Sequence, residues 1–574
     1  MARLSEKCAK GSGIWYNMGI TMQVVRGMKY IEGENRYQTN MLPNNIEDYV
    51  DEENPVRVID AFVDGLDMEA LGFLRFEPAE MGRPAYNPRD LLKLYIYGYL
   101  NKIRSSRKLM KECGRNVELF WLIGKLQPDF RTIADFRKDN AKALQNTFRA
   151  FGKICLKLKL YQKELLAIDG SKIRAQNSKD NCYNAEVLEK KLTHIDQKIA
   201  EYLDLMDKTD REELEEEPSA ETIKTAINEL THRKEKYQGY LAELEKSGET
   251  QLLTTDPEAR RMHSKDGFHC CYNVQTAVDS GSHLIAEYEV TNHNTDQGLL
   301  NEVSEKSKKQ LEIEVVETVA DKGYESREDI LNCIMNGTVP TVAMKYDKEK
   351  RLYNIPYQEA EISEAECTST KPEDIRKCIS AGVLPKCYEG TCIEVELQEK
   401  SVLSCFSLND DGTVTCPMGN ILRKVCTKGR NTEYACKDAC RQCPNRCTSS
   451  SSHKKVSFSQ GTKYVPVKMY GSIRHKLNSI PPDEAPNQGN HTLFRKDQAE
   501  KKVVIHITPD KEKLKQRMCL SEHPFGTVKW YHGAYYLLCR GKEKTAAELG
   551  LSFLAYNLTR VINMIGVKAL IAAM

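Results

Sequence analysis

Apolar residues recur at helical spacing through the first quarter of the chain. Between residues 46 and 160 they fall three and four positions apart, and short polar segments separate the runs. One run follows Pro88, and proline is tolerated in the first turn of a helix. We therefore predict an all-α domain over residues 28–160. Residues 1–27 lack any such pattern, and we predict a disordered extension there.

Two later apolar runs end abruptly in an aspartate. Leu165–Ile168 leads into Asp169, and Val315–Ala320 leads into Asp321. Short runs of this kind are typical of buried strands, so each strand would carry a carboxylate to the edge of a sheet. Strand patterns recur at residues 272–279, 284–290 and 339–343, where Pro340 favours an edge strand. With helices between them, these strands predict an α/β core with a mixed sheet flanked by helices, in residues 161–345 and 511–574.

Two insertions interrupt this predicted core. Residues 184–250 contain two runs of apolar residues at heptad spacing, which predict a coiled-coil helical hairpin. A structural arm is the favoured interpretation of the hairpin, and a protein–protein or dimer contact is the alternative. Residues 346–510 have little clear periodicity, are basic and hold many of the 20 cysteines, so we predict a cysteine-rich basic insertion.

Charge is distributed unevenly, although the net charge is only +2. Residues 83–150 hold 15 Lys and Arg against 6 Asp and Glu (+9), residues 451–520 hold 14 against 6 (+8), and residues 184–250 hold 10 against 18 (−8). Basic regions suit nucleic acid, and a solvated surface is the alternative for any one of them. The short basic helices of the first domain favour a helix-turn-helix DNA reader over a plain bundle. The candidate DNA contacts there are Arg104, Arg107, Lys108, Arg131, Arg137 and Lys138.

The carboxylates are the strongest chemical signal. Two divalent ions roughly 3.5–4 Å apart can clamp an in-line displacement at a phosphodiester, and Mg²⁺ or Mn²⁺ prefers carboxylate oxygens. Asp169 and Asp321 at strand ends, with Glu522 from a helix, would supply such a site. An aspartate before a glycine is more often a turn former when taken singly. Pro524 perturbs a helix, so Glu522 is expected beside a helix break.

The cysteines suggest a second metal. Cys440, Cys443 and Cys447 are closely spaced, and Cys416 lies upstream. Such spacing matches tetrahedral structural zinc, with Cys436 as the alternative fourth ligand. Free thiols are the alternative interpretation. We expect no secretory signal peptide and no membrane span in residues 549–574, which predicts a cytoplasmic protein.

Several motifs together resemble bacterial insertion-sequence transposases of the Asp-Asp-Glu type. The three catalytic blocks correspond to Ala167–Ser171, Val319–Tyr324 and Glu522–Thr527, and similarity extends to residues 267–279, 292–298 and 554–558 and to the helical front, from about Met28 to Gly566. The resemblance implies a ribonuclease-H-like core. It also implies that Asp169, Asp321 and Glu522 bind two Mg²⁺ or Mn²⁺ ions, and that Arg517 and Lys529 are the basic residues flanking the glutamate.

The activity that this resemblance implies is the cutting of element ends and their joining to target DNA. Its partners would be double-stranded DNA, as terminal inverted repeats and target, and at least one further copy of the chain. A bacterial, nucleoid-associated location would follow. Two rival functions remain at this point: a metal-dependent nuclease on the same fold, and a zinc-bearing DNA-binding protein with a catalytically dead core.

Overall fold

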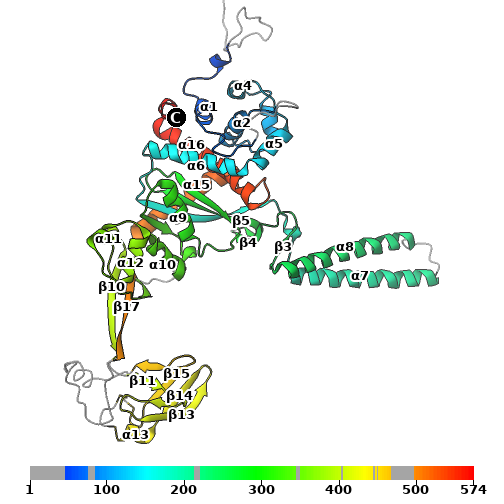
Figure 1. Cartoon of the computed structure of the whole chain (residues 1–574). Coiled ribbons are helices and arrows are strands. Elements are labelled where there is room, and N and C mark those ends of the chain that lie inside the picture. Colours follow the sequence, from blue (N-terminus) through cyan, green and yellow to red (C-terminus); the bar gives the residue numbers. More distant parts are fainter. Residues whose placement is uncertain are drawn as a thin grey trace, which may run out of the picture. The chain divides into compact units, whose positions relative to one another are not determined.

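The computed structural model describes residues 45–74, 85–212, 220–264, 266–343, 350–402, 405–443, 447, 448, 450–466 and 497–574 (Figure 1). The extension predicted at residues 1–27 lies outside them. The chain divides into two units, Met1–Tyr49 and Val50–Met574. In the first unit the described residues include a 3-10 turn, η1 (Ile46–Tyr49). Every element described below belongs to the second unit.

Helices fill the front of this unit, as the apolar spacing predicts. They are α1 (Val56–Asp64), α2 (Pro88–Leu100), α3 (Ser106–Glu112), α4 (Val117–Leu122), α5 (Phe130–Asp139) and α6 (Ala141–Lys157). α2 begins at Pro88, where the Asn87 side chain accepts the Arg89 N–H and so caps the helix. Residues 88–99 of α2 are all buried except for two partly exposed positions, so α2 lies at the centre of the helical region.

A mixed sheet follows the helices. Its strands are β1 (Leu165–Arg174), β4 (Arg260–Ser264), β5 (Gly267–Asp279), β6 (Ile285–Thr291), β7 (Val316–Ala320) and β8 (Thr338–Val342). The order is β6–β5–β1–β7–β8, and β4 also pairs with β5. The β6–β5 and β5–β1 pairs are antiparallel, whereas β1–β7 and β7–β8 are parallel. Pro340 lies on the edge strand β8, so the predictions of a mixed sheet and of an edge position are confirmed.

One face of the sheet is covered by α15 (Lys511–Gly526). Leu165, Ala167 and Val319 point to this face, where they form a small apolar cluster with Leu520 and Leu514 of the helix. Because alternate residues of a strand point to opposite faces, the next residues in the two series, Asp169 and Asp321, follow on the α15 side. The packing of α15 therefore decides which side chains meet the two aspartates.

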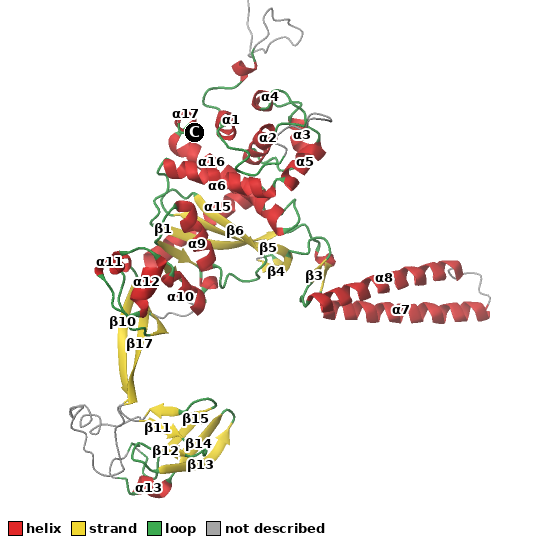
Figure 2. Ribbon diagram, in the orientation of Figure 1, coloured by secondary structure: helices red, strands yellow, loops and turns green. Residues whose placement is uncertain are grey.

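The opposite face belongs to the main core. Leu166 and Ile168 of β1 enter this core together with residues of α9 (Leu300–Leu311) and α16 (Lys542–Ile565). α16 is buried along most of its length and packs on both α6 and the sheet (Figure 2). On the sheet side, the Asn557 amide accepts the Ile285 N–H at 2.9 Å and donates to the Ile285 carbonyl at 2.9 Å. α16 therefore joins the helical region to the sheet in one core.

A buried ion cluster strengthens this junction. Glu548 of α16 is 1% exposed, and its carboxylate pairs with the Arg104 guanidinium, which also donates to the Gly533 and Tyr536 carbonyls. The same carboxylate accepts the N–H groups of Leu538 and Cys539. Burial raises the pKa of Glu548, but Arg137 and Arg104 outweigh it and hold the pKa below the ordinary value.

The first insertion is a pair of packed helices, α7 (Ala185–Glu212) and α8 (Ala220–Ser247). The short strands β2 (Cys182–Tyr183) and β3 (Leu252–Leu253) pair at its base, where Tyr183, Leu188 and Leu244 are buried together. η2 (Lys179–Asn181) precedes β2. The heptad pattern remains a prediction of coiled-coil packing, and the turn around Pro218 lies outside the described residues.

The second insertion contains two antiparallel sheets that its sequence pattern does not reveal. β9 (Arg351–Pro356) and β10 (Ile393–Val402) flank β17 (Asp497–Ile507). The other sheet has the order β15–β14–β13–β12–β11–β16. Its strands are β11 (Cys405–Leu408), β12 (Val414–Thr415), β13 (Ile421–Lys428), β14 (Asn431–Ala435), β15 (Lys455–Ser459) and β16 (Tyr464–Pro466). Among the residues that the structure describes, its buried core consists of six: Phe406, Val414, Leu422, Tyr434, Val456 and Phe458. β13 buries only Leu422, so alternation is too weak to signal a strand.

Short helices complete the described structure. They are η3 (Lys322–Tyr324), α10 (Arg327–Met335), α11 (Glu364–Thr368), α12 (Pro372–Ser380), η4 (Lys386–Tyr388), α13 (Lys437–Arg441), the π-helical turn η5 (Thr527–Tyr531) and α17 (Val567–Ala572). Among the described helices, none combines the length and apolar character that crossing a membrane requires.

The buried cluster predicts that Glu548→Gln destabilises the protein. The substitution leaves the Arg104 and Arg137 guanidiniums buried without their carboxylate, which costs about 3–5 kcal/mol. Because the folded-state pKa of Glu548 is depressed, its contribution is present above the unfolded value and is lost as pH falls through the folded pKa. Urea unfolding of both proteins from pH 7 to pH 3 measures the difference, which should shrink as the pH falls.

Glu543→Gln is the matched control, since Glu543 is exposed in the first turn of the same helix. Its effect should stay below about 1 kcal/mol. Equal effects of the two substitutions would contradict the assigned role of Glu548.

Candidate active site

The sheet brings two of the predicted carboxylates together. Ile168 of β1 lies opposite Ala320 of β7 in the parallel register, and an aspartate follows each of them. The Asp321 charge contributes to raising the pKa of Asp169, as expected for neighbouring carboxylates. The Asp321 side chain also accepts the Lys322 N–H at 2.6 Å and caps η3. Asp169 and Asp321, 152 residues apart in sequence, therefore lie beside each other where the parallel pairing of β1 and β7 ends, although β1 itself continues to Arg174.

Asp169 is held in a partly closed environment. Its side chain is 21% exposed, and one carboxylate oxygen accepts the Gly170 N–H at 2.9 Å. The Arg517 guanidinium lies 3.6 Å from the other oxygen. Burial is the largest influence and raises the pKa of Asp169, and the hydrogen bond from Ser521, the Arg517 charge and the Gly170 N–H oppose it only in part. A cation beside this carboxylate would relieve the cost of its burial.

The side chains that meet the sheet from α15 fall four residues apart. Lys513 pairs with Glu317 of β7, and Arg517 and Ser521 reach Asp169. A spacing of four keeps the three side chains on one face of the helix. Beyond this helix the Lys529 ammonium donates to the Ser171 hydroxyl and to the Lys172 carbonyl. The structure therefore places both flanking basic residues, Arg517 and Lys529, at the Asp169 end of β1.

Glu522 does not lie with the two aspartates. It is exposed, and its neighbour Ser521 is the buried residue that bonds to Asp169. Because one residue turns an α-helix by about 100°, Glu522 points away from the face that Ser521 presents. The predicted break at Pro524 is also wrong: α15 continues through Pro524 to Gly526, and the irregularity is the π-helical turn η5 that follows.

A further carboxylate, Asp296, lies beside the pair and was not among the predicted site residues. One of its oxygens accepts from the Asn273 amide at 2.8 Å and from the Gln275 amide at 2.9 Å. Its charge acts on buried Tyr324 together with those of Asp169 and Asp321. The sequence held one sign of a further group at this place: a glycine follows Asp169 and another lies two residues after Asp321, and glycine permits close approach of another group.

The predicted DNA-contacting residues of the helical region divide into two groups. Arg107, Lys108, Arg131 and Lys138 are exposed on α3 and α5. Arg104 and Arg137 are buried, because the first pairs with Glu548 and the second donates to the Tyr99 hydroxyl at 3.0 Å. Neither buried guanidinium is available to a phosphate in this structure, and both serve the internal junction.

The predicted zinc ligands gather at one end of the small insertion sheet. Cys416, Cys436 and Cys447 pack against its core, and Cys440 lies on α13. Burial raises the pKa of Cys416, and a Cys443 thiolate would raise it further. Burial likewise raises the pKa of Cys447, where Cys440 and Cys443 add to the effect. These interactions link the four favoured cysteines, although no group of three or more His, Cys, Asp or Glu among the described residues is arranged to hold a metal.

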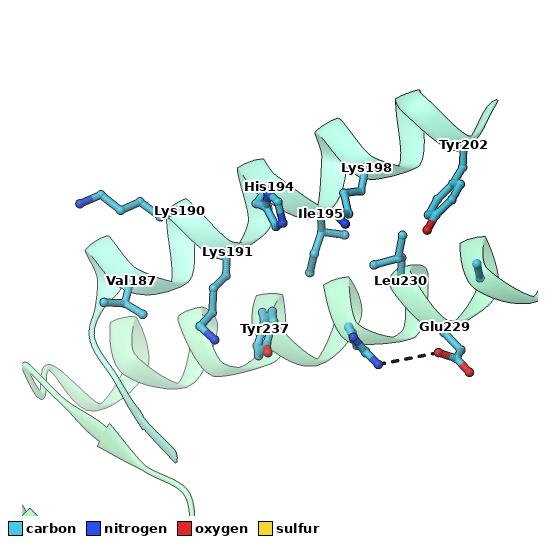
Figure 3. Close-up of a pocket in the computed structure, with 12 residues that line it drawn as sticks. Val187, Lys190, Lys191, His194, Ile195, Lys198, Tyr202, Glu229, Leu230 and Tyr237 are labelled. Atoms are coloured by element: carbon cyan, nitrogen blue, oxygen red, sulfur yellow. Dashed lines mark ion pairs between the residues drawn. The ribbon is translucent and has the colours of Figure 1, made fainter. Parts of the chain in front are cut away.

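A pocket of about 610 Å³ lies elsewhere, between α7 and α8 (Figure 3). Cationic side chains line much of it, including Lys190, Lys191, Lys198 and Arg233. Two of these pair with acids on their own helices, Lys190 with Glu186 and Arg233 with Glu229. The pocket contains none of the predicted site residues, so we base the candidate site on the sheet edge.

Comparison with known proteins gives one family match. Residues 44–139, which include α1 to α5, match the family described as a transposase domain, DUF772. No curated protein matches the chain. Among solved structures, the chain is similar to the piggyBac transposase synaptic complex with hairpin DNA, at 8% identity and a TM-score of 0.27, over 90% of this chain and 76% of that chain. The family match supports a transposase role.

Proposed function

We propose that the chain is a DNA transposase of the Asp-Asp-Glu type, which cuts the ends of an insertion element and joins them to target DNA. The observation that carries this proposal is that Asp169 and Asp321 directly follow the last paired residues of two adjacent parallel strands, Ile168 and Ala320. The transposase-domain match of the helical region supports it independently. The mixed strand order, with β1 between an antiparallel and a parallel neighbour, is compatible with a ribonuclease-H-like core.

The donor set at the sheet edge suits a hard divalent cation. Asp169 and Asp321 offer carboxylate oxygens of the kind that Mg²⁺ and Mn²⁺ prefer, and burial raises the pKa of Asp169 because its neighbours compensate the buried charge only in part. Two such ions would activate the attacking oxygen and stabilise the leaving oxygen of a phosphodiester. The chain's own contribution is to hold the carboxylates in place. Arg517 and Lys529 supply positive charge beside them for the phosphate.

In our proposal, α15 rotates by the angle that one residue spans, and this rotation brings Glu522 to the aspartates. The π-helical turn η5 holds an extra residue, downstream of Glu522. If the extra residue is instead accommodated on the N-terminal side of Ser521, the helical segment between the two places turns by about 100°. Glu522 then occupies the position that Ser521 holds in this structure, facing Asp169. Pro524 favours such an adjustment, since it removes one backbone hydrogen bond from the helix.

The remaining parts would bind and position DNA. Exposed Arg107, Lys108, Arg131 and Lys138 lie on α3 and α5, within the matched domain. They would contact phosphates of the terminal repeats, with the salt dependence typical of such contacts. Joining two element ends to one target requires at least two copies of the chain in the active complex.

Zinc would stabilise the cysteine-rich sheet. Six buried residues are a small core for a six-stranded sheet, and small domains of this kind commonly depend on a metal. We propose Cys416, Cys440, Cys443 and Cys447 as its ligands, with Cys436 as the alternative fourth.

The aspartate pair is tested by Asp169→Asn and Asp321→Asn in a strand-transfer assay. The substrate is a pre-cleaved duplex from the DNA that flanks the gene, with a supercoiled target plasmid and Mn²⁺. Each substitution should lower joining by about 100-fold or more, the effect of removing one charge-stabilising group from an enzyme site. Asp266→Asn, an exposed loop carboxylate, is the control. Hydrolysis without joined products would favour the nuclease, and DNA binding with no metal-dependent cleavage would favour the catalytically dead protein.

The rotation of α15 is tested by exchanging two side chains. In Ser521→Glu/Glu522→Ser the carboxylate faces Asp169 in the register of this structure, whereas Glu522→Gln removes it altogether. If the helix turns in the active complex, both variants should lose joining to a similar extent and Ser521→Ala should retain it. Full activity of the exchanged variant would show that the helix acts in its present register. Activity of Glu522→Gln would remove Glu522 from the site.

Zinc is tested by metal analysis of the purified full-length protein. We expect one zinc per chain in addition to any divalent ion at the aspartates. Cys440→Ser should lower the zinc content and expose residues 405–466 to limited proteolysis, while Cys426→Ser, in β13 of the same sheet, should change neither. Zinc-free wild-type protein with the same protease resistance would contradict the assignment.

A further inference from the structure

Asp296 lies between the residues that follow the two aspartates on β1 and after β7. A Cβ atom placed on Gly170, the residue after Asp169, would come 2.4 Å from the Gln275 amide nitrogen and 2.6 Å from one Asp296 oxygen. A Cβ atom placed on Gly323, two residues after Asp321, would come 3.3 Å from the other oxygen. The carboxylate therefore fills the space between β1 and η3. Room for a side chain is short at Gly170 and tight at Gly323, and neither glycine has a positive φ.

A network of buried side chains fixes the Asp296 carboxylate in this space. The Asn273 and Gln275 amides both donate to its Oδ1, and these two side chains are buried on β5. The Gln275 carbonyl in turn accepts from the Tyr324 hydroxyl, and Tyr324 is 1% exposed at the end of η3. The network thus runs from β5 through Asp296 to the segment that directly follows Asp321.

A second link attaches the loop of Asp296 to the same segment. The side-chain amide of Gln297, the next residue, donates to the Glu325 carbonyl at 3.3 Å, just beyond η3. On the other side, Gly170 lies opposite Gln275 in the β1–β5 register. The loop therefore has fixed contacts on both sides of the gap between Asp169 and Asp321.

We infer that Asp296 is a positioning residue that sets the separation of Asp169 and Asp321. This inference rests on the proposed function, in which the two aspartates share divalent ions. Asp296 need not touch the ions: its size fixes the gap between Gly170 and Gly323, and its negative charge adds to the potential that attracts a cation. Groups that orient metal-binding side chains in this way typically contribute 10–100-fold to metal affinity.

The inference is tested by Asp296→Asn and Asp296→Ala in the full-length protein, with Mn²⁺ titrated in the strand-transfer assay. Asparagine can still accept from Asn273 and Gln275 but lacks the charge, whereas alanine also empties the gap. Asp296→Asn should raise the Mn²⁺ concentration for half-maximal joining by about 10-fold and leave the rate at saturating Mn²⁺ nearly unchanged. Asp296→Ala should raise it further and also lower the rate at saturation.

Gly170→Ala provides an independent test of the same contact. Its methyl group would displace both the Gln275 amide and the Asp296 carboxylate that this amide holds, so the substitution should raise the Mn²⁺ requirement in wild type. Asn294→Ala, an exposed residue of the same loop, should change neither quantity. The midpoint of thermal unfolding, measured without metal, separates lost positioning from lost folding.

The outcomes distinguish this inference from the proposed function. Suppose that wild type joins DNA and that its Mn²⁺ requirement is the same in three variants, Asp296→Asn, Asp296→Ala and Gly170→Ala. Asp296 then has no positioning role. If the Asp296 variants change only the unfolding midpoint, the residue is structural and the inference fails. If wild type neither cuts nor joins DNA with any divalent ion, the proposed function fails first. In that case direct Mn²⁺ binding, measured by electron paramagnetic resonance, must still weaken in Asp296→Asn for the inference to stand.

Discussion

The parallel pairing of β1 with β7 is the constraint on which the rest of the structure depends. It alone sets Asp169 and Asp321 beside each other, since the two strands are separated by 141 residues from the end of β1 to the start of β7. Parallel neighbours need a crossover connection, and here it includes the hairpin α7–α8, the strands β5 and β6 and the helix α9. The insertions leave the register unchanged because they begin and end at the sheet. Burying the Asp169 carboxylate is unfavourable, and Arg517, Ser521 and the Gly170 N–H reduce this cost.

The helical region and the sheet behave as one body for a related electrostatic reason. Arg104 and Arg137, from the front of the chain, are buried with Glu548 of α16, and α16 is bonded through Asn557 to β6. If α3 and α5 bind the element ends, as we propose, this junction fixes their position relative to the aspartates. The positioning of DNA on α3 and α5 and the reaction at the aspartates then depend on one core.

The sequence allowed some of this architecture to be predicted, for identifiable physical reasons. Apolar runs that stop at Asp169 and Asp321 marked two strands and the edge they share, and Pro340 marked the outer strand. The direction of Glu522 was beyond prediction, because a shift of one residue turns a helix by about 100°. The burial of Arg104 was equally hidden, since its partner Glu548 lies 444 residues away. Strand β13 of the cysteine-rich insertion was missed because it buries a single side chain, which gives no alternation. The assignment of Asp169, Asp321 and Glu522 to catalysis, and of the cysteines to zinc, remains a prediction.

The central claim is that Asp169 and Asp321 together bind the divalent ions of a DNA-joining enzyme. Anomalous diffraction from crystals grown with Mn²⁺ addresses it without requiring knowledge of the DNA sequence. We expect an anomalous peak in contact with both carboxylates, which disappears in Asp169→Asn crystals of the same form. Mn²⁺ bound elsewhere in well-ordered wild-type crystals, with no peak between these two side chains, would contradict it.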